Sequence, residues 1–195
     1  MNIEIKVPDG ISGDWEVSTF TVQASELSQR ISKLQTGRGV PEGTYKRLTR
    51  CGEVIVSNTT DEIWDFSMFL RYRATGKVLI NGLGLGVLVQ GLLEKPDITE
   101  ITIIEKSEDV IKLSGPTYLK DERVNIIHAD AFEYKPPKGK LYDAVWHDIW
   151  DYITSENIPE MKKLHRKYGR FAKYQESWCR KVCETIRKRE KNSWF

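Results

Sequence analysis

The sequence predicts an α/β fold built on a parallel β-sheet, preceded by a small β-rich unit and followed by helices. The first observation is a glycine-rich turn, with glycines at positions 82, 84 and 86 directly after the apolar residues 78–80. The second is that three more strand-like runs follow, at residues 101–105, 124–130 and 142–148, and each ends in an acid. Alternating strands and helices favour a parallel sheet, whose carboxyl edge then carries these acids around one pocket.

Length and composition limit the class of protein. A chain of 195 residues has room for one substantial core and a small appendage. The sequence contains no run of 18 apolar residues, so no membrane-spanning helix is predicted. It also lacks a basic start followed by an apolar stretch, so no secretory signal is predicted. The three cysteines (Cys51, Cys179 and Cys183) make a poor disulfide framework and, with scattered histidines, no metal-ligand spacing. We therefore expect a cytoplasmic protein without a metal site or membrane contact.

The net charge of +2 hides an uneven distribution. From Met161 onward the chain has twelve Lys or Arg and three Glu, so this segment carries +9 and the preceding residues carry −7. A basic C-terminal arm on an acidic body can bind nucleic acid, an acidic partner or its own body, or it can be a solvated surface.

The chain divides into an N-terminal β-rich lead-in (residues 1–60), a central core (61–158) and a basic helical C-terminus (159–195), which we expect to form one compact domain. In the lead-in, strands are expected at residues 3–7, Trp15–Val22 and 54–57, with a weaker signal at 44–49. A short helix is expected at residues 24–34. A second helix is expected to start at Thr60, with Thr60 or Asp61 as its cap, and to end by Gly76.

The core is expected to contain four parallel strands and two helices. The expected strands are residues 77–80, residues 100–105, Val124–His128 and Tyr142–His147. The expected helices are residues 86–94, stopped by Pro96, and residues 108–113, capped by Ser107 and ended at Gly115-Pro116.

The C-terminus has helical rather than strand periodicity. Its apolar residues recur at steps of three and four, which predicts one or two long amphipathic helices with a break near Gly169. They are Met161, Leu164, Tyr168 and Phe171, followed by Trp178, Val182 and Ile186. No fifth strand is evident, so we expect a truncated sheet whose open edge is covered by these helices, the N-terminal unit or a second subunit.

Two of the acids suit a nucleoside. Glu105 lies 23 residues after Gly82, where an acid accepts hydrogen bonds from both ribose hydroxyls in nucleoside-binding folds. The alternative is a surface carboxylate paired with Lys106 or another neighbour. Asp130 is placed to meet an adenine amino group, and the alternative is a turn or capping role before Ala131.

Two other acids, Asp148 and Asp151, stand beyond the last expected strand of the core. An ionised carboxylate there can attract a sulfonium or ammonium charge, or take a proton from an attacking amine. The neighbouring Trp146, Trp150 and Tyr152 offer aromatic surface to a cation. The alternative is that these aromatic residues cover a sheet edge.

Taken together, these motifs resemble the class I AdoMet-dependent methyltransferase superfamily, and most closely its spermidine synthase-like branch. Residues 129–133 (Ala-Asp-Ala-Phe-Glu) are similar to the family motif after the third strand. Residues 142–151 are similar to the family motif Tyr-Asp-Val-Ile-x-x-Asp-x-x-Asp at the fourth strand. Residues 52–62 look like the hairpin and acidic segment that precede the nucleotide fold in aminopropyltransferases. The likeness covers residues 52–151, about half of the chain, and implies a truncated Rossmann-like, class I methyltransferase sheet.

The resemblance also implies site residues. The turn glycines would line the methionine and ribose end of S-adenosylmethionine (AdoMet). Glu105 would hold the ribose and Asp130 the adenine, and the adjacent Asn81, Lys106 and Ala131 are further expected cofactor-binding residues. Asp148 would deprotonate an amine acceptor and Asp151 would bind it. These residues are Asn81, Gly82, Gly84, Gly86, Glu105, Lys106, Asp130, Ala131, Asp148 and Asp151.

The sequence departs from the family pattern in three places. Asn81 replaces an acid that many methyltransferases carry at the end of the first strand, Leu85 replaces an Asp within the turn, and the last strands are not evident. The Asn/Asp-Pro-Pro-Tyr/Phe motif of amino-directed nucleic-acid methyltransferases is absent from the sequence, as are the P-loop and Gly-x-Ser-x-Gly motifs.

Three functional hypotheses follow. The first is an AdoMet-dependent transferase acting on a small or peptidyl nucleophile, with methyl as the more common cargo and aminopropyl, from decarboxylated AdoMet, as the alternative. The second is a non-catalytic nucleoside-binding or assembly protein. The third is nucleic-acid binding by the C-terminal arm, where Phe171, Tyr174 and Trp178 either stack on bases or pack into the core. Independently of these hypotheses, a homo-oligomer is compatible with the open sheet edge.

Overall fold

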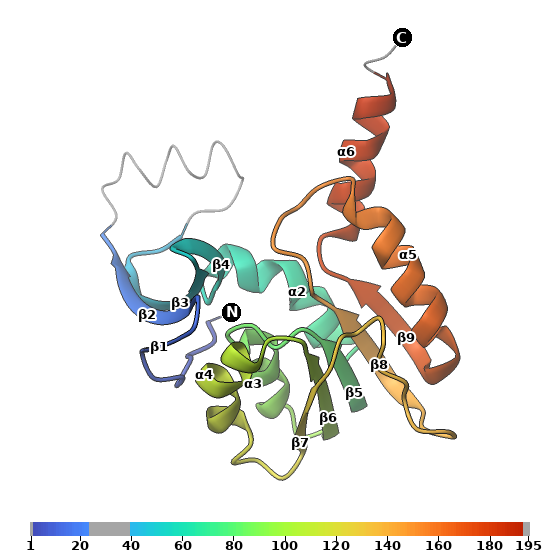
Figure 1. Ribbon diagram of the computed structural model, residues 1–195, viewed down its shortest axis with the longest axis horizontal. Coiled ribbons are helices and arrows are strands. Elements are labelled where there is room, and N and C mark those ends of the chain that lie inside the picture. The colour runs from blue at the N-terminus through green and yellow to red at the C-terminus, as the bar shows by residue number, and fades with distance from the viewer. Residues whose placement is uncertain (1, 24–39, 193–195) are drawn as a thin grey trace.

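The computed structural model describes residues 2–23 and 40–192. Its centre is a five-stranded sheet in the order β7-β6-β5-β8-β9 (Figure 1). The strands are β5 (Gly76–Asn81), β6 (Ile98–Glu105), β7 (Val124–His128), β8 (Tyr142–His147) and β9 (Ala172–Ser177). All neighbouring pairs run parallel, which confirms the predicted α/β fold with a Rossmann-like sheet.

Five α-helices accompany the strands in the described part of the chain. They are α2 (Thr60–Tyr72), α3 (Val87–Leu93), α4 (Glu108–Tyr118), α5 (Asn157–Tyr168) and α6 (Arg180–Asn192). Both sheet faces are covered because alternate residues of each strand point to opposite sides. Val78 and Ile80 join a buried cluster with residues of α2, α3 and α4. Leu79 joins a second cluster with Leu164 and Tyr168 of α5.

The N-terminal unit is an antiparallel sheet in the order β1-β2-β3-β4. Its strands are β1 (Gly10–Ser12), β2 (Trp15–Val22), β3 (Gly43–Arg50) and β4 (Glu53–Ser57). Strand β2 matches its predicted bounds, and β3 and β4 match theirs within one residue. The unit packs beside the carboxyl edge of the large sheet (Figure 1), and Val17 and Leu48 join the main buried cluster.

The prediction of a strand at residues 3–7 is wrong, since this segment forms no ladder. Its side chains still alternate, with Ile3, Ile5 and Val7 buried and the residues between them exposed. The Asn58 side chain donates to the Ile3 carbonyl at 2.9 Å. Burial and this bond hold the segment extended without a partner strand. The helix predicted at residues 24–34 lies outside the described residues.

The prediction that the sheet stops at four strands is also wrong. Strand β9 pairs with β8 in parallel, from Tyr142 beside Ala172 to His147 beside Ser177. Its sequence Ala-Lys-Tyr-Gln-Glu-Ser has few β-branched or large apolar residues, because it is an edge strand and only one of its residues is buried. The predicted break at Gly169 is confirmed, where a 3-10 turn (Gly169–Phe171) leads from α5 into β9.

Two helix ends differ from their predictions. Helix α2 begins at Thr60 as predicted, but its cap is Thr59 instead of Thr60 or Asp61, because the Ile63 amide bonds to the Thr59 carbonyl at 3.1 Å. Helix α4 is capped by Ser107 as predicted but continues through Pro116 to Tyr118. The buried Tyr118 hydroxyl donates to the Leu85 carbonyl at 2.8 Å, which holds the last turn against the glycine turn. No described helix has the length and apolar content to cross a bilayer.

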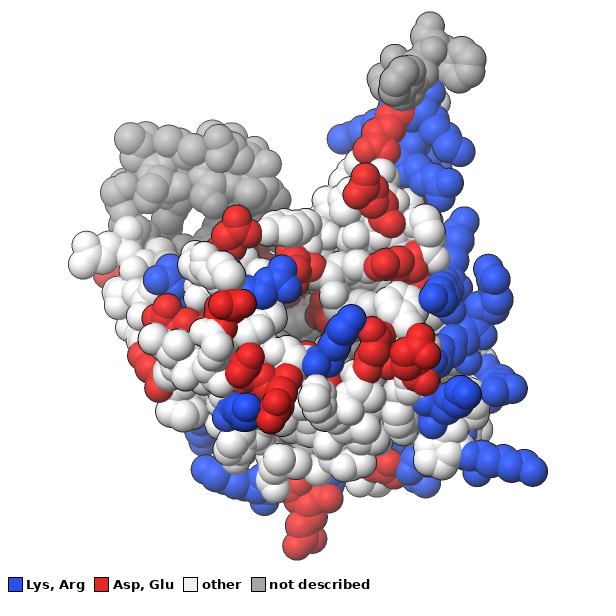
Figure 2. Space-filling view, in the orientation of Figure 1, with Lys and Arg blue, Asp and Glu red and all other residues white. Residues whose placement is uncertain are grey.

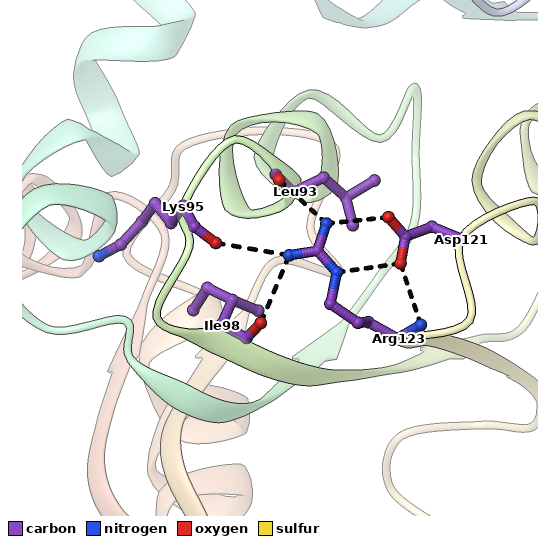
Figure 3. A network of polar contacts seen from close by, with 5 residues as sticks. All are labelled: Leu93, Lys95, Ile98, Asp121 and Arg123. Carbon is purple, nitrogen blue, oxygen red and sulfur yellow. Dashed lines mark hydrogen bonds and ion pairs between the residues drawn. The ribbon is translucent and has the colours of Figure 1, made fainter.

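Arg123 joins the end of α3, the start of β6 and the turn before β7 (Figure 3). Its guanidinium forms an ion pair with Asp121 at 2.8 Å. It also donates to the carbonyls of Leu93, Lys95 and Ile98, at 3.0, 3.4 and 3.3 Å. These carbonyls lie between the end of α3 and the start of β6, where the helix leaves acceptors without intrahelical donors. One side chain therefore braces the connection between α3 and β6.

We predict that Arg123→Ala lowers the free energy of unfolding by about 1–3 kcal/mol, because three carbonyls and the Asp121 carboxylate lose their hydrogen bonds from the Arg123 side chain. Urea denaturation of wild type and variant measures the change. The matched control is Lys120→Ala, at an exposed position whose side chain forms no hydrogen bond or ion pair with the described residues, and it should change stability by less than about 0.5 kcal/mol. Equal stability of the two variants would contradict the bracing role of Arg123.

Candidate functional site

A cavity of about 540 Å³ lies at the carboxyl edge of the parallel sheet, between the glycine turn and the N-terminal unit. Acidic residues gather on the face that carries this hollow, coloured red in Figure 2. Nine of the ten predicted site residues line the cavity. They are Gly82, Gly84, Gly86, Glu105, Lys106, Asp130, Ala131, Asp148 and Asp151.

The glycines are needed for steric reasons. Gly82 has φ +100°, and a Cβ there would lie 1.9 Å from the Asp148 carbonyl oxygen. Gly86 has φ +76°, and its Cβ would lie 2.1 Å from the Tyr118 ring. Both φ values fall where L side chains are strained. The turn can therefore pass close to the end of β8 and the side of α4 only with glycine at these two positions.

Glu105 organises the loops above the sheet. Its two carboxylate oxygens accept from the backbone amides of Leu83 and Ser107, each at 2.7 Å. A carboxylate oxygen has two lone pairs, so each can accept one further bond from a ligand. Glu105 therefore ties the glycine turn to the start of α4 while keeping acceptor capacity at the cavity wall.

Asp130 forms an ion pair with Lys106 at 2.8 Å and accepts from the Phe132 amide at 2.7 Å. The Lys106 hydrogen bond is the main cause that lowers the pKa of Asp130, so this carboxyl is ionised at neutral pH. Asp130 therefore stabilises its own turn through the Phe132 amide and also lines the cavity.

A second pair of acids differs from Glu105 and Asp130 in its electrostatics. Burial raises the pKa of Asp148 to about 7. The hydrogen bond that Asp148 accepts from the Trp146 indole N–H at 3.3 Å lowers this pKa, but its effect is smaller than that of burial. Burial likewise raises the pKa of Glu62 to about 7, although Glu62 accepts from the Ser57 amide and hydroxyl at 2.9 Å. Two carboxyl groups that titrate near neutral pH therefore share one wall of the cavity.

Asp151 and its neighbours form the rim. The Arg50 guanidinium pairs with Asp151 at 2.5 Å and lies over the Trp15 ring, 5.3 Å from its centroid. The Trp150 indole donates to Glu160 of α5 at 2.8 Å. The rim thus joins the N-terminal unit, the loop after β8 and α5.

Asn81 is the predicted site residue that the structure places away from the cavity wall. Its side chain is fully buried and lies 2.7 Å from His147 Nδ1. Gln175 donates its amide to the His165 carbonyl, which leaves its oxygen to accept from His147 Nε2 at 3.2 Å. Burial lowers the pKa of His147 to about 3, so it stays neutral and accepts from Asn81 at Nδ1.

Sequence reasoning missed the contribution of the N-terminal unit and α2. Trp15, Arg50, Ser57 and Glu62 line the cavity although they precede the glycine turn by 20 residues or more. The similarity of residues 52–62 to an aminopropyltransferase hairpin was the one feature of the sequence that indicated a role for this region, and it includes Ser57 and Glu62. Within the described ranges, no group of His, Cys, Asp or Glu side chains is arranged to hold a metal ion.

No family model matches the sequence, and no curated protein sequence matches it. Among solved structures, the chain is similar to spermidine synthase from Thermotoga maritima, with 18% identity and a TM-score of 0.49 over 88% of this chain and 54% of that one. It is also similar to N-methyltransferase NodS from Bradyrhizobium japonicum WM9 in complex with S-adenosyl-L-homocysteine. There the identity is 13% and the TM-score 0.46, over 58% of this chain and 57% of that one. The chain thus spans little more than half the length of either protein, and such likeness concerns the fold alone.

We predict that Asp148 makes stability fall as the pH rises. Its folded pKa of about 7 lies above its ordinary value of 3.8, so between these values the native state binds the proton more tightly than the unfolded state does. Stability is therefore lost as the pH rises through about 7. Urea denaturation near pH 5 and pH 8 should show a larger loss for wild type than for Asp148→Asn, by on the order of 1–3 kcal/mol. The control is Asp14→Asn, at an exposed position, which should follow wild type. Equal losses for wild type and Asp148→Asn would contradict the shifted pKa.

Proposed function

We propose that the protein binds AdoMet or its decarboxylated form in this cavity and transfers a group from its sulfonium to an amine. The observation that carries the proposal is the arrangement of acids in one cavity. Glu105 and Asp130 stand at the sheet edge beside the glycine turn, and Asp148 and Glu62, with pKa values near 7, line the same space.

The nucleoside half of the proposal rests on the turn and the two sheet-edge acids. Gly82, Gly84 and Gly86 have positive φ values and no Cβ, so a ligand can approach the backbone of the turn at these positions. Glu105 keeps acceptor capacity for ribose hydroxyls, and Asp130 is an ionised acceptor for an amino group. The volume of about 540 Å³ is within the range of small-molecule and cofactor sites.

The acceptor half rests on Asp148 and its surroundings. Attack by a neutral amine forms a C–N bond and breaks the C–S bond, whose electron pair stays on sulfur as a thioether. The nitrogen then sheds a proton, and a carboxylate of pKa near 7 is suited to receive it at neutral pH. Trp15, Trp146, Trp150 and Trp178 also line the cavity, and their faces attract a sulfonium or ammonium cation.

A specific observation favours aminopropyl transfer as the second candidate, beside the more common methyl transfer. Among the described residues that line the cavity, the cationic ones are Arg50 and Lys106, and each is ion-paired with an aspartate. The methionine carboxylate of AdoMet would therefore have no unpaired side-chain cation to bind among these residues. Decarboxylated AdoMet lacks this carboxylate and does not require such a cation. A preference between the two nucleosides distinguishes the candidates.

We predict that AdoMet or decarboxylated AdoMet binds with micromolar affinity, and that Glu105→Gln weakens binding at least about tenfold because a ribose acceptor becomes an amide. Isothermal titration calorimetry with both nucleosides and S-adenosylhomocysteine measures this. Glu108→Gln, on the exposed first turn of α4, is the matched control and should bind as wild type does. If none of the three ligands binds wild type, the nucleoside proposal fails.

We predict that turnover with an amine acceptor rises with pH through about 7, as Asp148 loses its proton. Asp148→Asn should lower kcat about 100-fold or more and abolish this rise, while nucleoside affinity stays within a few fold. A pH–rate profile with calorimetry on the same samples separates the two effects. Normal turnover by the Asp148→Asn variant would contradict the role of Asp148 as proton acceptor. Nucleoside binding by wild type without any turnover would favour the non-catalytic binding protein.

A further inference from the structure

A second groove, of about 300 Å³, lies between α5 and α6 and is strongly basic. Its lining consists of four cations, one acid and one apolar residue. They are Lys162, Arg187, Lys188, Lys191, Glu184 and Ile158. Lysine and arginine side chains also gather along this flank of the molecule, coloured blue in Figure 2. The groove is separate from the acid-lined cavity, and no part of the proposed transfer uses it.

The cations form a row rather than a point. On α6, residues 184, 187, 188 and 191 recur at steps of three, four and seven, so they share one helix face. Arg187 and Lys191 are four residues apart, which is about 6 Å along the helix. Lys162 of α5 faces this row from the opposite wall. The charge therefore extends along the groove and suits a ligand with repeated anionic groups.

The positive charge of the groove is not neutralised by the fold. Its single acid, Glu184, is ion-paired with Arg180 at 3.0 Å. None of the four groove cations forms an ion pair within residues 2–23 and 40–192. Cations held close together repel one another, and a bound polyanion relieves that repulsion.

We propose that this groove binds the sugar–phosphate backbone of a nucleic acid. Repeated phosphates match a row of cations, since binding is driven by phosphate neutralisation and counterion release. Adsorption to an anionic membrane would need an apolar face beside the charge, and Ile158 is the one apolar residue of the lining.

The expected binding is insensitive to base sequence. The aromatic residues considered for base stacking, Phe171, Tyr174 and Trp178, are partly buried against the two large clusters. They are thereby held in the core rather than presented to bases. Contacts to phosphate without base readout give a salt-dependent, sequence-independent interaction.

The test is fluorescence anisotropy of a labelled single-stranded RNA of about 20 nucleotides and mixed sequence, at about 50 and 200 mM salt. The groove variant combines Lys162→Gln, Arg187→Gln, Lys188→Gln and Lys191→Gln. The matched control removes the same charge at exposed positions elsewhere, with Lys6→Gln, Lys77→Gln, Lys120→Gln and Lys138→Gln. The groove variant should bind at least about tenfold more weakly, with a salt slope smaller by about three. The control should remain within about twofold of wild type.

A further variant, with Lys162→Arg, Lys188→Arg and Lys191→Arg, keeps the charge and should keep the affinity, which separates lost charge from lost structure. The proposal is overturned if RNA does not bind wild type at the lower salt, or if the groove variant binds as wild type does. Binding to phosphatidylserine vesicles without binding to RNA would also overturn it. Because the readout is RNA binding alone, failure here leaves the proposed transfer untouched, and failure of the transfer leaves this inference untouched.

Discussion

The close approach of Gly82 to the Asp148 carbonyl is the constraint on which the site depends. A Cβ at position 82 would lie 1.9 Å from that oxygen, so the ends of β5 and β8 can lie this close only because the residue is glycine. The Gly82 amide bonds to the Ile104 carbonyl at 2.8 Å, and the Asp148 amide bonds to the Asn81 carbonyl at 2.8 Å. This backbone contact at the ends of the parallel strands β5 and β8 therefore positions the glycine turn beside Asp148 at the cavity wall.

The side chains on the two sides of this backbone contact differ in charge and in accessibility. On the cavity side, acids remain available at partly accessible positions. On the other side, Asn81, His147 and Gln175 form a buried polar chain that joins β5, β8 and β9. A neutral histidine can satisfy such a chain as donor and acceptor without the cost of a buried charge. This chain holds the edge strand β9 in the sheet although few of its residues are apolar.

The sequence predicted the elements whose patterns are local. Val124–His128 and Tyr142–His147 are apolar runs with clear ends, and the structure has the same bounds. Strand β9 was missed because its polar residues are retained by side-chain bonds and an edge position, which periodicity does not report. Nine of the predicted residues line one cavity because the carboxyl ends of parallel strands meet at one edge. Arg50 enters the cavity through packing of the N-terminal unit against that edge, which no local pattern reports, and Glu62 was indicated only by the similarity of residues 52–62 to an aminopropyltransferase hairpin.

The central claim is that the acid-lined cavity is a nucleoside site, and a crystal structure of the protein with S-adenosylhomocysteine tests it most directly. We expect the ribose hydroxyls to lie within hydrogen-bond distance of Glu105, the adenine beside Asp130, and the sulfur at the end of the cavity nearest Asp148. A nucleoside bound elsewhere on the protein, or crystals grown at saturating ligand with this cavity empty, would contradict it.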